Sequence, residues 1–260
     1  MSIGVFDSGI GGLTVFKSIS ENFPEANIYY IGDTARVPYG NKSAETIIRY
    51  SLELSNFLIK NFNVDLLVIA CNSASSYAFE TVKKYTNIPV IDVITAGVLN
   101  AISKTKNKKI GVIGTQATIR SKSYEKKIKD IGKDYQVFSK ACPLFVPLVE
   151  EGRIKGNITR LIIKDYLDDI VNEGIDTLIL GCTHYPLLKD EIKNLYPDLN
   201  IVDSTDIIPQ FIKNQNINLK ENGERRIFIT DESPSFYVLK DLLIPDLDIE
   251  KVELSEICTL

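Results

Sequence analysis

Residues 67–73 read LVIACNS, a short apolar run that ends in a cysteine and two polar residues. A strand that is apolar throughout, rather than alternating, is typical of a parallel sheet covered on both faces. Comparable runs alternate along the chain with segments of helical periodicity. This alternation indicates βαβ units, so the sequence predicts an α/β fold in which mostly parallel sheets are flanked by helices.

The short apolar runs are interpreted as strands and the longer periodic segments as helices. The expected strands span residues 3–6, 28–31, 66–70, 89–93, 110–113, 177–180, 201–202 and 227–230. The expected helices span residues 13–22, 44–61, 75–85, 124–131, 158–172 and 187–195.

A second copy of the opening pattern indicates an internal duplication. Residues 178–184, LILGCTH, resemble residues 67–73, and IGVIGT at 110–115 resembles IGVFDS at 3–8. The offsets are nearly equal, 182 − 71 = 111 and 110 − 3 = 107. We therefore expect two pseudo-symmetric α/β domains with the active site at their interface. The first comprises residues 1–95 and a returning tail at 208–260, and the second comprises residues 96–207.

Composition excludes several classes of function. Lys plus Arg total 30 against 34 for Asp plus Glu, so the basic excess of a nucleic-acid binder is absent. No stretch approaches the roughly 18 apolar residues of a membrane span, and the N-terminus lacks a signal-peptide pattern. The four cysteines form no C-x-x-C pair, so we expect thiols and no metal site. These features predict a cytoplasmic protein without nucleic-acid or membrane partners.

The two cysteines that end equivalent strands, Cys71 and Cys182, suggest a reaction. Cys71 opens a helix, where the helix dipole is expected to lower the pKa of a thiol. Racemisation removes a proton from one face of a carbon and returns one to the other face. Because the reaction is reversible, the two faces need chemically similar groups. A thiolate and a thiol on opposite sides of a substrate meet this need.

Several further residues are candidates for the same site. The glycine-rich turn DSGIGG at 7–12 offers N–H groups to an anion, but Thr14 breaks the dinucleotide fingerprint. Asn72 and Ser73 either donate to a carboxylate or cap a helix. The loop at 33–40 either holds a substrate through Tyr39 and the Gly40 N–H or is an ordinary connection. Glu150 either pairs with His184 and sets its charge or is solvated.

Two other functions remain open at this point. A hydrolase could use Cys182 with His184 as base, which leaves Cys71 a structural thiol. A non-catalytic binding protein could keep the same fold. The equivalent positions of Cys71 and Cys182 favour the racemase. Cys142 and Cys258 lack this setting and are assigned to packing or the surface.

The motifs place the chain close to a known group of enzymes. They are GVFDSGIGG at 4–12, ARVPYG at 35–40, ACNSA at 70–74, FVPLVE at 145–150 and LGCTHYP at 180–186. In these motifs the chain resembles the aspartate/glutamate racemase family, and within it the members that act on glutamate. The motifs occur in order between residues 4 and 186, so the resemblance covers most of the chain. One departure is Ser73, where the family commonly has threonine.

The resemblance implies a racemase that interconverts L-glutamate and D-glutamate without a cofactor and supplies D-glutamate for peptidoglycan. It implies that Cys71 acts on one enantiomer and Cys182 on the other, and that the protein is a homodimer. Assistance in proton transfer is implied for Asp7, His184 and Glu150. Substrate binding is implied for Asp7, Ser8, Tyr39, Gly40, Asn72, Ser73, Thr183 and His184.

Overall fold

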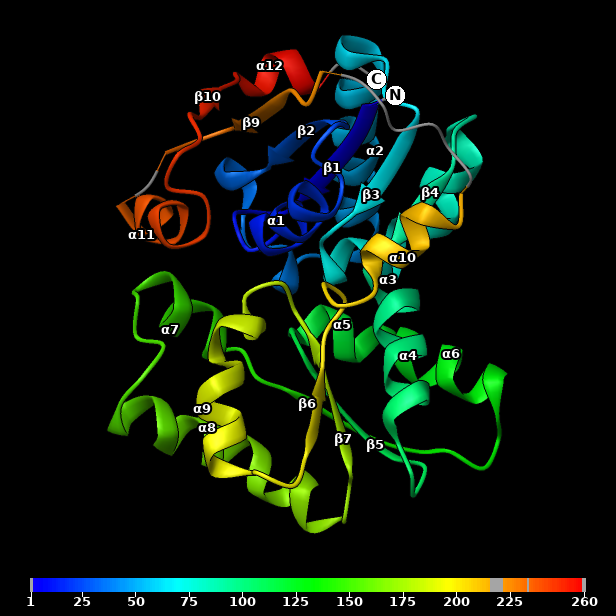
Figure 1. Ribbon diagram of the computed structural model, residues 1–260, viewed down its shortest axis with the longest axis vertical. Helices are drawn as coiled ribbons and strands as arrows, with labels where there is room; N and C mark the ends of the chain where they lie inside the picture. The colour runs from blue at the N-terminus through cyan, green and yellow to red at the C-terminus, as the bar shows by residue number, and fades with distance from the viewer. Residues whose placement is uncertain (1, 216–221, 233, 259–260) are drawn as a thin grey trace.

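The computed structural model describes residues 2–215, 222–232 and 234–258, which form two parallel sheets flanked by helices (Figure 1). The first sheet has the order β10-β9-β2-β1-β3-β4. Its strands are β1 (Ser2–Asp7), β2 (Asn27–Gly32), β3 (Leu66–Ile69), β4 (Val90–Asp92), β9 (Arg225–Ile229) and β10 (Glu250–Lys251). The second has the order β6-β5-β7-β8. Its strands are β5 (Lys109–Gly114), β6 (Gln136–Ala141), β7 (Thr177–Gly181) and β8 (Asn200–Val202). The predicted α/β class is confirmed.

Helices cover the faces of both sheets, as Figure 1 shows. Around the first sheet they are α1 (Leu13–Asn22), α2 (Ala44–Phe62), α3 (Asn72–Tyr85), α10 (Ile208–Lys213), α11 (Pro234–Leu243) and α12 (Leu254–Ile257). Around the second they are α5 (Gln116–Ser121), α6 (Ser123–Ile131), α7 (Phe145–Glu150), α8 (Asn157–Asn172) and α9 (Lys189–Leu195). Between the sheets in the chain comes α4 (Val93–Lys104).

The strand β3 is buried on both faces. Leu66 and Val68 belong to one core cluster, whereas Leu67 and Ile69 belong to another. Because alternate side chains of a strand point to opposite faces, both faces of β3 are covered. This explains why the run is apolar throughout instead of alternating.

The duplication is visible in the topology. The order β2-β1-β3-β4 in the first sheet matches β6-β5-β7-β8 in the second. The register matches as well, because Ile3 lies opposite Leu66 and Ile110 lies opposite Thr177. These pairs are related by the same two offsets, 107 and 111, that the sequence motifs show. Equivalent strand ends therefore carry equivalent motifs.

The structure contains elements that the sequence patterns did not predict, among them β6 in the second sheet and the helix α4. The strand β6 was not expected, because its QVFSKA sequence is only partly buried and has no apolar run. The segment around the expected boundary, 93–109, contains α4. Asp92 is the N-cap residue of this helix, and its carboxylate accepts from the N–H groups of Ile94 and Thr95. Val98 of α4 packs in a cluster with β5 and β7 residues, so this helix covers the second sheet. The expected boundaries themselves stay a prediction.

The loop after β1 lies against the end of β2. The Tyr30 hydroxyl donates to the carbonyl oxygen of Gly9 at 2.7 Å. A Cβ built at Gly32 would lie 2.2 Å from the same Gly9 oxygen, far inside contact distance. Gly32 is therefore required for the close approach of two backbone segments, and this approach fixes the turn that carries Asp7 and Ser8.

We predict that Gly32→Ala lowers the free energy of unfolding by about 1–3 kcal/mol, the usual cost of forcing an atom into filled space. Urea denaturation measures the change. Gly9→Ala is the matched control, because its Cβ would meet only Val37 Cγ2, at 3.4 Å. Equal stability of the two variants would contradict this account of the contact.

Candidate active site

The two cysteines singled out in the sequence line one small cavity between the halves. Cys71 and Cys182 are 4% and 6% exposed. The cavity has a volume of about 30 Å³. It is lined by Ser8, Val37, Pro38, Tyr39, Gly40, Cys71, Asn72, Ser73, Thr115, Val146, Cys182, Thr183 and His184. All the expected site residues except Asp7 and Glu150 thus line this cavity. Glu150 contacts His184, and Asp7 contacts the backbone of Ser8.

The parallel strands explain why these residues meet. In open α/β sheets, sites gather beyond the carboxyl ends of the strands. Asp7 is the last residue of β1, and Cys71 follows β3. In the second sheet, Thr115 follows β5 and Cys182 follows β7. The carboxyl ends of both sheets face the same cavity.

Cys71 is the N-cap residue of α3. Its sulfur accepts from the Ala74 N–H at 3.4 Å, and its S–H group donates to the Ser8 hydroxyl at 3.4 Å. Burial and the negative charge of Asp7 raise the pKa of Cys71 to about 12. The expected lowering of this pKa by the helix dipole is therefore wrong, because desolvation outweighs the bond at the helix start. Cys71 carries its proton in this state.

Asp7 is fully buried and is close enough to Cys71 for its charge to raise the pKa of that thiol. Its Oδ2 atom accepts from the N–H groups of Gly9 and Gly12, at 3.0 and 3.1 Å. Burial raises the pKa of Asp7, although the charge of His184 and the backbone donors oppose that shift. Its Oδ1 atom has no partner among the described residues. Asp7 therefore has a free carboxyl oxygen that can hold or pass on a proton.

Cys182 has a different set of neighbours. Its sulfur lies 3.9 Å from His184 Nδ1, and His184 Nε2 lies 3.1 Å from Glu150 Oε1. Burial opposes a charge on His184, but its hydrogen bonds to Cys182 and Glu150 outweigh burial and raise its pKa to about 10. A protonated imidazole donates from both nitrogens. His184 can therefore donate to the Cys182 sulfur while Glu150 compensates its charge.

Contacts across the interface hold the polar residues of the cavity in place. The Tyr124 hydroxyl donates to Asn72 Oδ1 at 2.7 Å, which leaves the amide N–H groups of Asn72 available. The hydroxyl groups of Ser73 and Thr115 lie 3.0 Å apart. A Cβ built at Gly11 would lie 2.4 Å from Thr183 Oγ1, so the two halves meet this closely only because position 11 is glycine.

Sequence reasoning missed Thr115, although the signal was present. The motif comparison aligns residues 110–115 with residues 3–8, so Thr115 is the counterpart of Ser8. Both hydroxyl side chains line the cavity. Val37, Pro38 and Val146 were also missed as lining residues, because apolar side chains carry no chemical signal of a site.

A wider cavity adjoins the inner one. It has a volume of about 210 Å³ and shares Val37, Pro38, Gly40, Thr115 and Val146 with the inner cavity. Its lining also includes Asn41, Gln116, Pro143, Pro147 and Glu150. The inner cavity is far smaller than the roughly 300–1,000 Å³ of typical ligand sites. An amino acid can reach both sulfurs only if the inner cavity widens.

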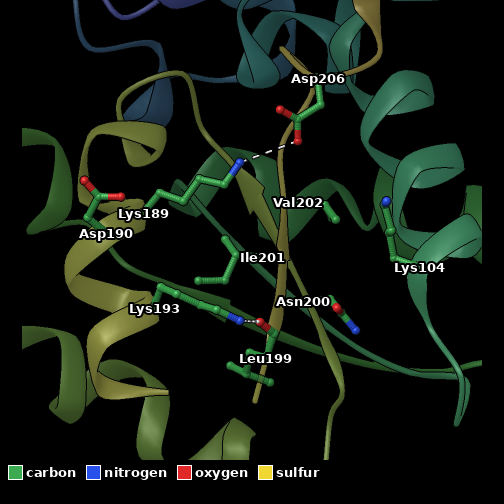
Figure 2. A pocket seen from close by; sticks show the side chains of 9 residues that line it. All are labelled: Lys104, Lys189, Asp190, Lys193, Leu199, Asn200, Ile201, Val202 and Asp206. Carbon is green, nitrogen blue, oxygen red and sulfur yellow. Dashed lines mark hydrogen bonds and ion pairs between the residues drawn. The ribbon is translucent and has the colours of Figure 1, made fainter. Parts of the chain in front are cut away.

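A larger cavity, of about 440 Å³, lies along the edge strand β8 and contains none of the candidate residues (Figure 2). Two of its lysines are engaged within the protein. Lys189 lies 3.0 Å from an Asp203 carboxylate oxygen and 3.5 Å from one of Asp206. Lys193 donates to the carbonyl oxygen of Leu199 at 2.8 Å. This cavity is therefore distinct from the one that contains Cys71 and Cys182, and two of its charged groups are already paired within the protein.

Two further features, a metal site and a membrane-spanning helix, are not found within the described ranges. No group of three or more His, Cys, Asp or Glu side chains is arranged to hold a metal ion there. Among those same residues, no helix has the length and hydropathy to cross a membrane.

Comparisons with known proteins agree with these features. The family model described as Asp/Glu/Hydantoin racemase matches residues 3–211. The chain is 63% identical over 261 residues to a glutamate racemase of Persephonella marina, with all of both chains covered. The solved glutamate racemase from Aquifex pyrophilus is similar, with a TM-score of 0.84 and 50% identity over 96% of this chain and 98% of that one. The glutamate racemase from Francisella tularensis, solved in complex with D-glutamate, has a TM-score of 0.89 and 38% identity over 97% of each chain.

We predict that the imidazole of His184 remains protonated through pH 8.5, with a midpoint near 10. Because the chain has one histidine, its ring resonances give this midpoint directly by NMR.

Glu150→Gln should lower the midpoint of the His184 titration. A raised folded-state pKa contributes stability that is full below about pH 6.5 and is lost as pH rises through 10. Between pH 6.5 and 10 the free energy of unfolding should therefore fall less for Glu150→Gln than for the wild type. A His184 titration midpoint near 6.5 in the wild type would contradict the pairing of His184 with Cys182 and Glu150.

Proposed function

The chain belongs to the Asp/Glu/Hydantoin racemase family, and from this membership and the paired thiols we propose that it interconverts L-glutamate and D-glutamate. The observation that carries the proposal is that Cys71 and Cys182, from equivalent strand ends of two related halves, line one cavity. We further propose that the D-glutamate serves peptidoglycan synthesis. The free thiols that the reaction needs persist in a reducing compartment, which supports a cytoplasmic location.

The proposed reaction is a proton exchange at Cα. The thiolate of one cysteine takes the proton and becomes a thiol, which leaves a carbanion at Cα. The thiol of the other cysteine returns a proton to the opposite face and becomes a thiolate. No electrons enter or leave, so the chemistry requires no oxidant, and we propose that it requires no cofactor. After a turnover the two sulfurs have exchanged protonation states.

The neighbours of the two thiols support a division of roles. Cys71 keeps its proton next to Asp7, which suits it to act first as the acid. Cys182 has the cationic His184 within reach of its sulfur, which suits it to act first as the base. We assign Asp7 to proton transfer on the Cys71 side, and His184 with Glu150 to the Cys182 side. The reverse reaction starts from the opposite protonation states.

We assign substrate binding to the polar groups of the cavity. Glutamate carries two carboxylates, and hydroxyl, amide and backbone N–H donors suit both. The assigned residues are Ser8, Tyr39, Gly40, Asn72, Ser73, Thr183 and His184, with Asp7 behind them and Thr115 added from the structure. Ser73 keeps a hydroxyl group, which lies 3.0 Å from that of Thr115.

We predict that Cys71→Ala and Cys182→Ala each reduce the rate of racemisation by roughly a hundredfold or more, since a lost general acid or base typically costs about 10²–10⁴-fold. Circular dichroism at a single wavelength follows the enantiomers, and mass spectrometry follows deuterium incorporation at Cα. The assay contains a metal chelator and no pyridoxal phosphate. Cys142→Ser is the control, because Cys142 lies outside the cavity. Retained racemisation in both alanine variants would refute the two-thiol mechanism.

We also propose a homodimer. Large apolar side chains are exposed on two helices, Ile158 and Leu161 on α8 and Val238 and Leu242 on α11. Each pair has a helical spacing that puts both side chains on one face, and exposed apolar patches are typical of interfaces.

Light scattering is predicted to give twice the chain mass of 29.1 kDa at micromolar concentration. Leu161→Glu and Leu242→Glu then locate the interface, since the substitution within it should shift the mass toward a monomer. A wild-type mass of one chain at every concentration would contradict the dimer.

A further inference from the structure

A buried group of polar side chains lies behind the segment that carries Tyr39 and Gly40. We call it the Arg36 cluster, and its members are Asp33, Arg36, Tyr39, Glu53 and Thr230. The guanidinium Nε atom of Arg36 donates to both carboxylate oxygens of Asp33, at 2.9 and 2.7 Å. Its Nη1 atom donates to Glu53. The side chains of Asp33, Arg36 and Glu53 are 0%, 11% and 8% exposed.

Tyr39 connects this cluster to the active site. It lines the inner cavity, yet its hydroxyl group donates to Asp33 Oδ2. The hydroxyl is therefore engaged on the far side of the ring and serves as an anchor. What Tyr39 and Gly40 offer to a substrate is the ring and the backbone N–H groups. Their position depends on where Asp33 holds the phenol.

Arg36 in turn determines where Asp33 lies. Burial opposes the charge of Arg36, but its hydrogen bonds to Asp33 and Glu53 outweigh burial and raise its pKa. The guanidinium carbon also lies 3.9 Å from the centroid of the Tyr50 ring, which packs 5.6 Å from the Tyr39 ring. Buried ion pairs add little to stability relative to apolar side chains of similar volume. Three buried charges behind a substrate-binding loop therefore call for another role.

The C-terminal tail supports the cluster from the opposite side. The Thr230 hydroxyl, just after β9, donates to Asp33 Oδ1 at 3.2 Å and accepts from the Ala35 N–H at 2.8 Å. The Thr34 hydroxyl also accepts from the Asp231 N–H at 2.7 Å. The loop that begins at Asp33 is thus held by side chains from α2 and from the residues after β9.

We propose that Arg36 is a positioning residue for the racemase: through Asp33 and the Tyr39 hydroxyl it sets the place of the Tyr39–Gly40 backbone at the cavity. The inference rests on the proposed function. Arg36 does not line the cavity, so it acts through Tyr39 rather than on the substrate. Its fork of donors satisfies Asp33 and Glu53 together, which a lysine ammonium cannot reproduce.

The test compares Arg36→Lys with Arg49→Lys. Arg49 is the matched control, because it contacts the same Glu53 carboxylate at 4.0 Å from a side chain that is 61% exposed. Arg36→Lys should raise the KM for both enantiomers tenfold or more and change kcat less than KM, since displaced binding groups alone can cost up to about a hundredfold. The Kd for D-glutamate from calorimetry should rise in parallel. Arg49→Lys should change each value less than twofold.

A second pair of variants keeps the inference testable if Arg36→Lys does not fold. Thr230→Val removes the hydroxyl that bridges β9 and Asp33 at nearly constant volume, and it should raise KM in the same sense. In a double-mutant cycle, Tyr39→Phe should abolish the added effect of Thr230→Val or Arg36→Lys, because the cluster acts through the Tyr39 hydroxyl. A purely structural role lowers the melting temperature without this KM effect or this coupling.

Two outcomes overturn the inference. In the first, Arg36→Lys and Thr230→Val fold and have the KM and Kd of the wild type. In the second, their effects on KM simply add to the effect of Tyr39→Phe. Failure of the proposed function is distinguishable, because it shows in the wild-type chain as absent racemisation of glutamate in the same assay. Binding of D-glutamate to the variants is measured independently of turnover.

Discussion

Two thiols from different halves of the chain are buried beside one cavity, and the arrangement of both sheets serves to bring them there. A thiolate that removes a proton from an amino acid Cα must be reactive, and water weakens every charge interaction in a site. Both sulfurs are accordingly almost fully buried. In the proposed mechanism the two sulfurs lie on opposite sides of one carbon, so two separate strand ends have to supply them. Two related sheets whose carboxyl ends face each other meet that geometric demand.

The duplicated halves have diverged at the residues that surround these thiols. By the motif offsets, the counterpart of Asp7 is Gly114, and the counterpart of His184 is Ser73. One sulfur therefore has a buried carboxyl group as its neighbour and the other has an imidazole paired with Glu150. The symmetry of the fold places the thiols, while its breakdown at single positions gives each thiol a different titratable neighbour. The same backbone thus supports two unequal half-sites.

Much of the fold could be predicted from the sequence, because buried strands have a recognisable apolar pattern. The runs at 66–70 and 177–180 are strands because both of their faces are covered, and their repetition predicts the paired halves. The partly exposed β6 has no such run and escaped prediction. Most polar residues of the inner cavity followed from motif spacing and resemblance, although Thr115 was missed. The pairing of Asp33, Arg36 and Glu53 did not follow, because it is created by tertiary contacts.

The protonation of Cys71 shows a limit of local reasoning. A helix start favours a thiolate, and that rule alone gave the wrong direction of the pKa shift. The opposing effects are burial and the charge of Asp7, which is 64 positions away in the chain. Neither is visible until the strands are packed. The chemistry of a residue at a motif can therefore be guessed from its type, whereas its charge state requires the fold.

The return of the C-terminal tail to the first sheet has a consequence for biosynthesis. The strand β9 pairs with β2, and Thr230 contacts Asp33 across 197 positions of sequence. While the chain emerges from the ribosome, this edge of β2 has no strand to pair with until residues 225–229 have been translated. Unpaired edges invite association between chains, and pairings this distant in sequence form slowly. The first half is therefore most exposed to association with other chains before β9 is made, and a product truncated before residue 225 lacks the contacts of Thr230 with Asp33 and Ala35.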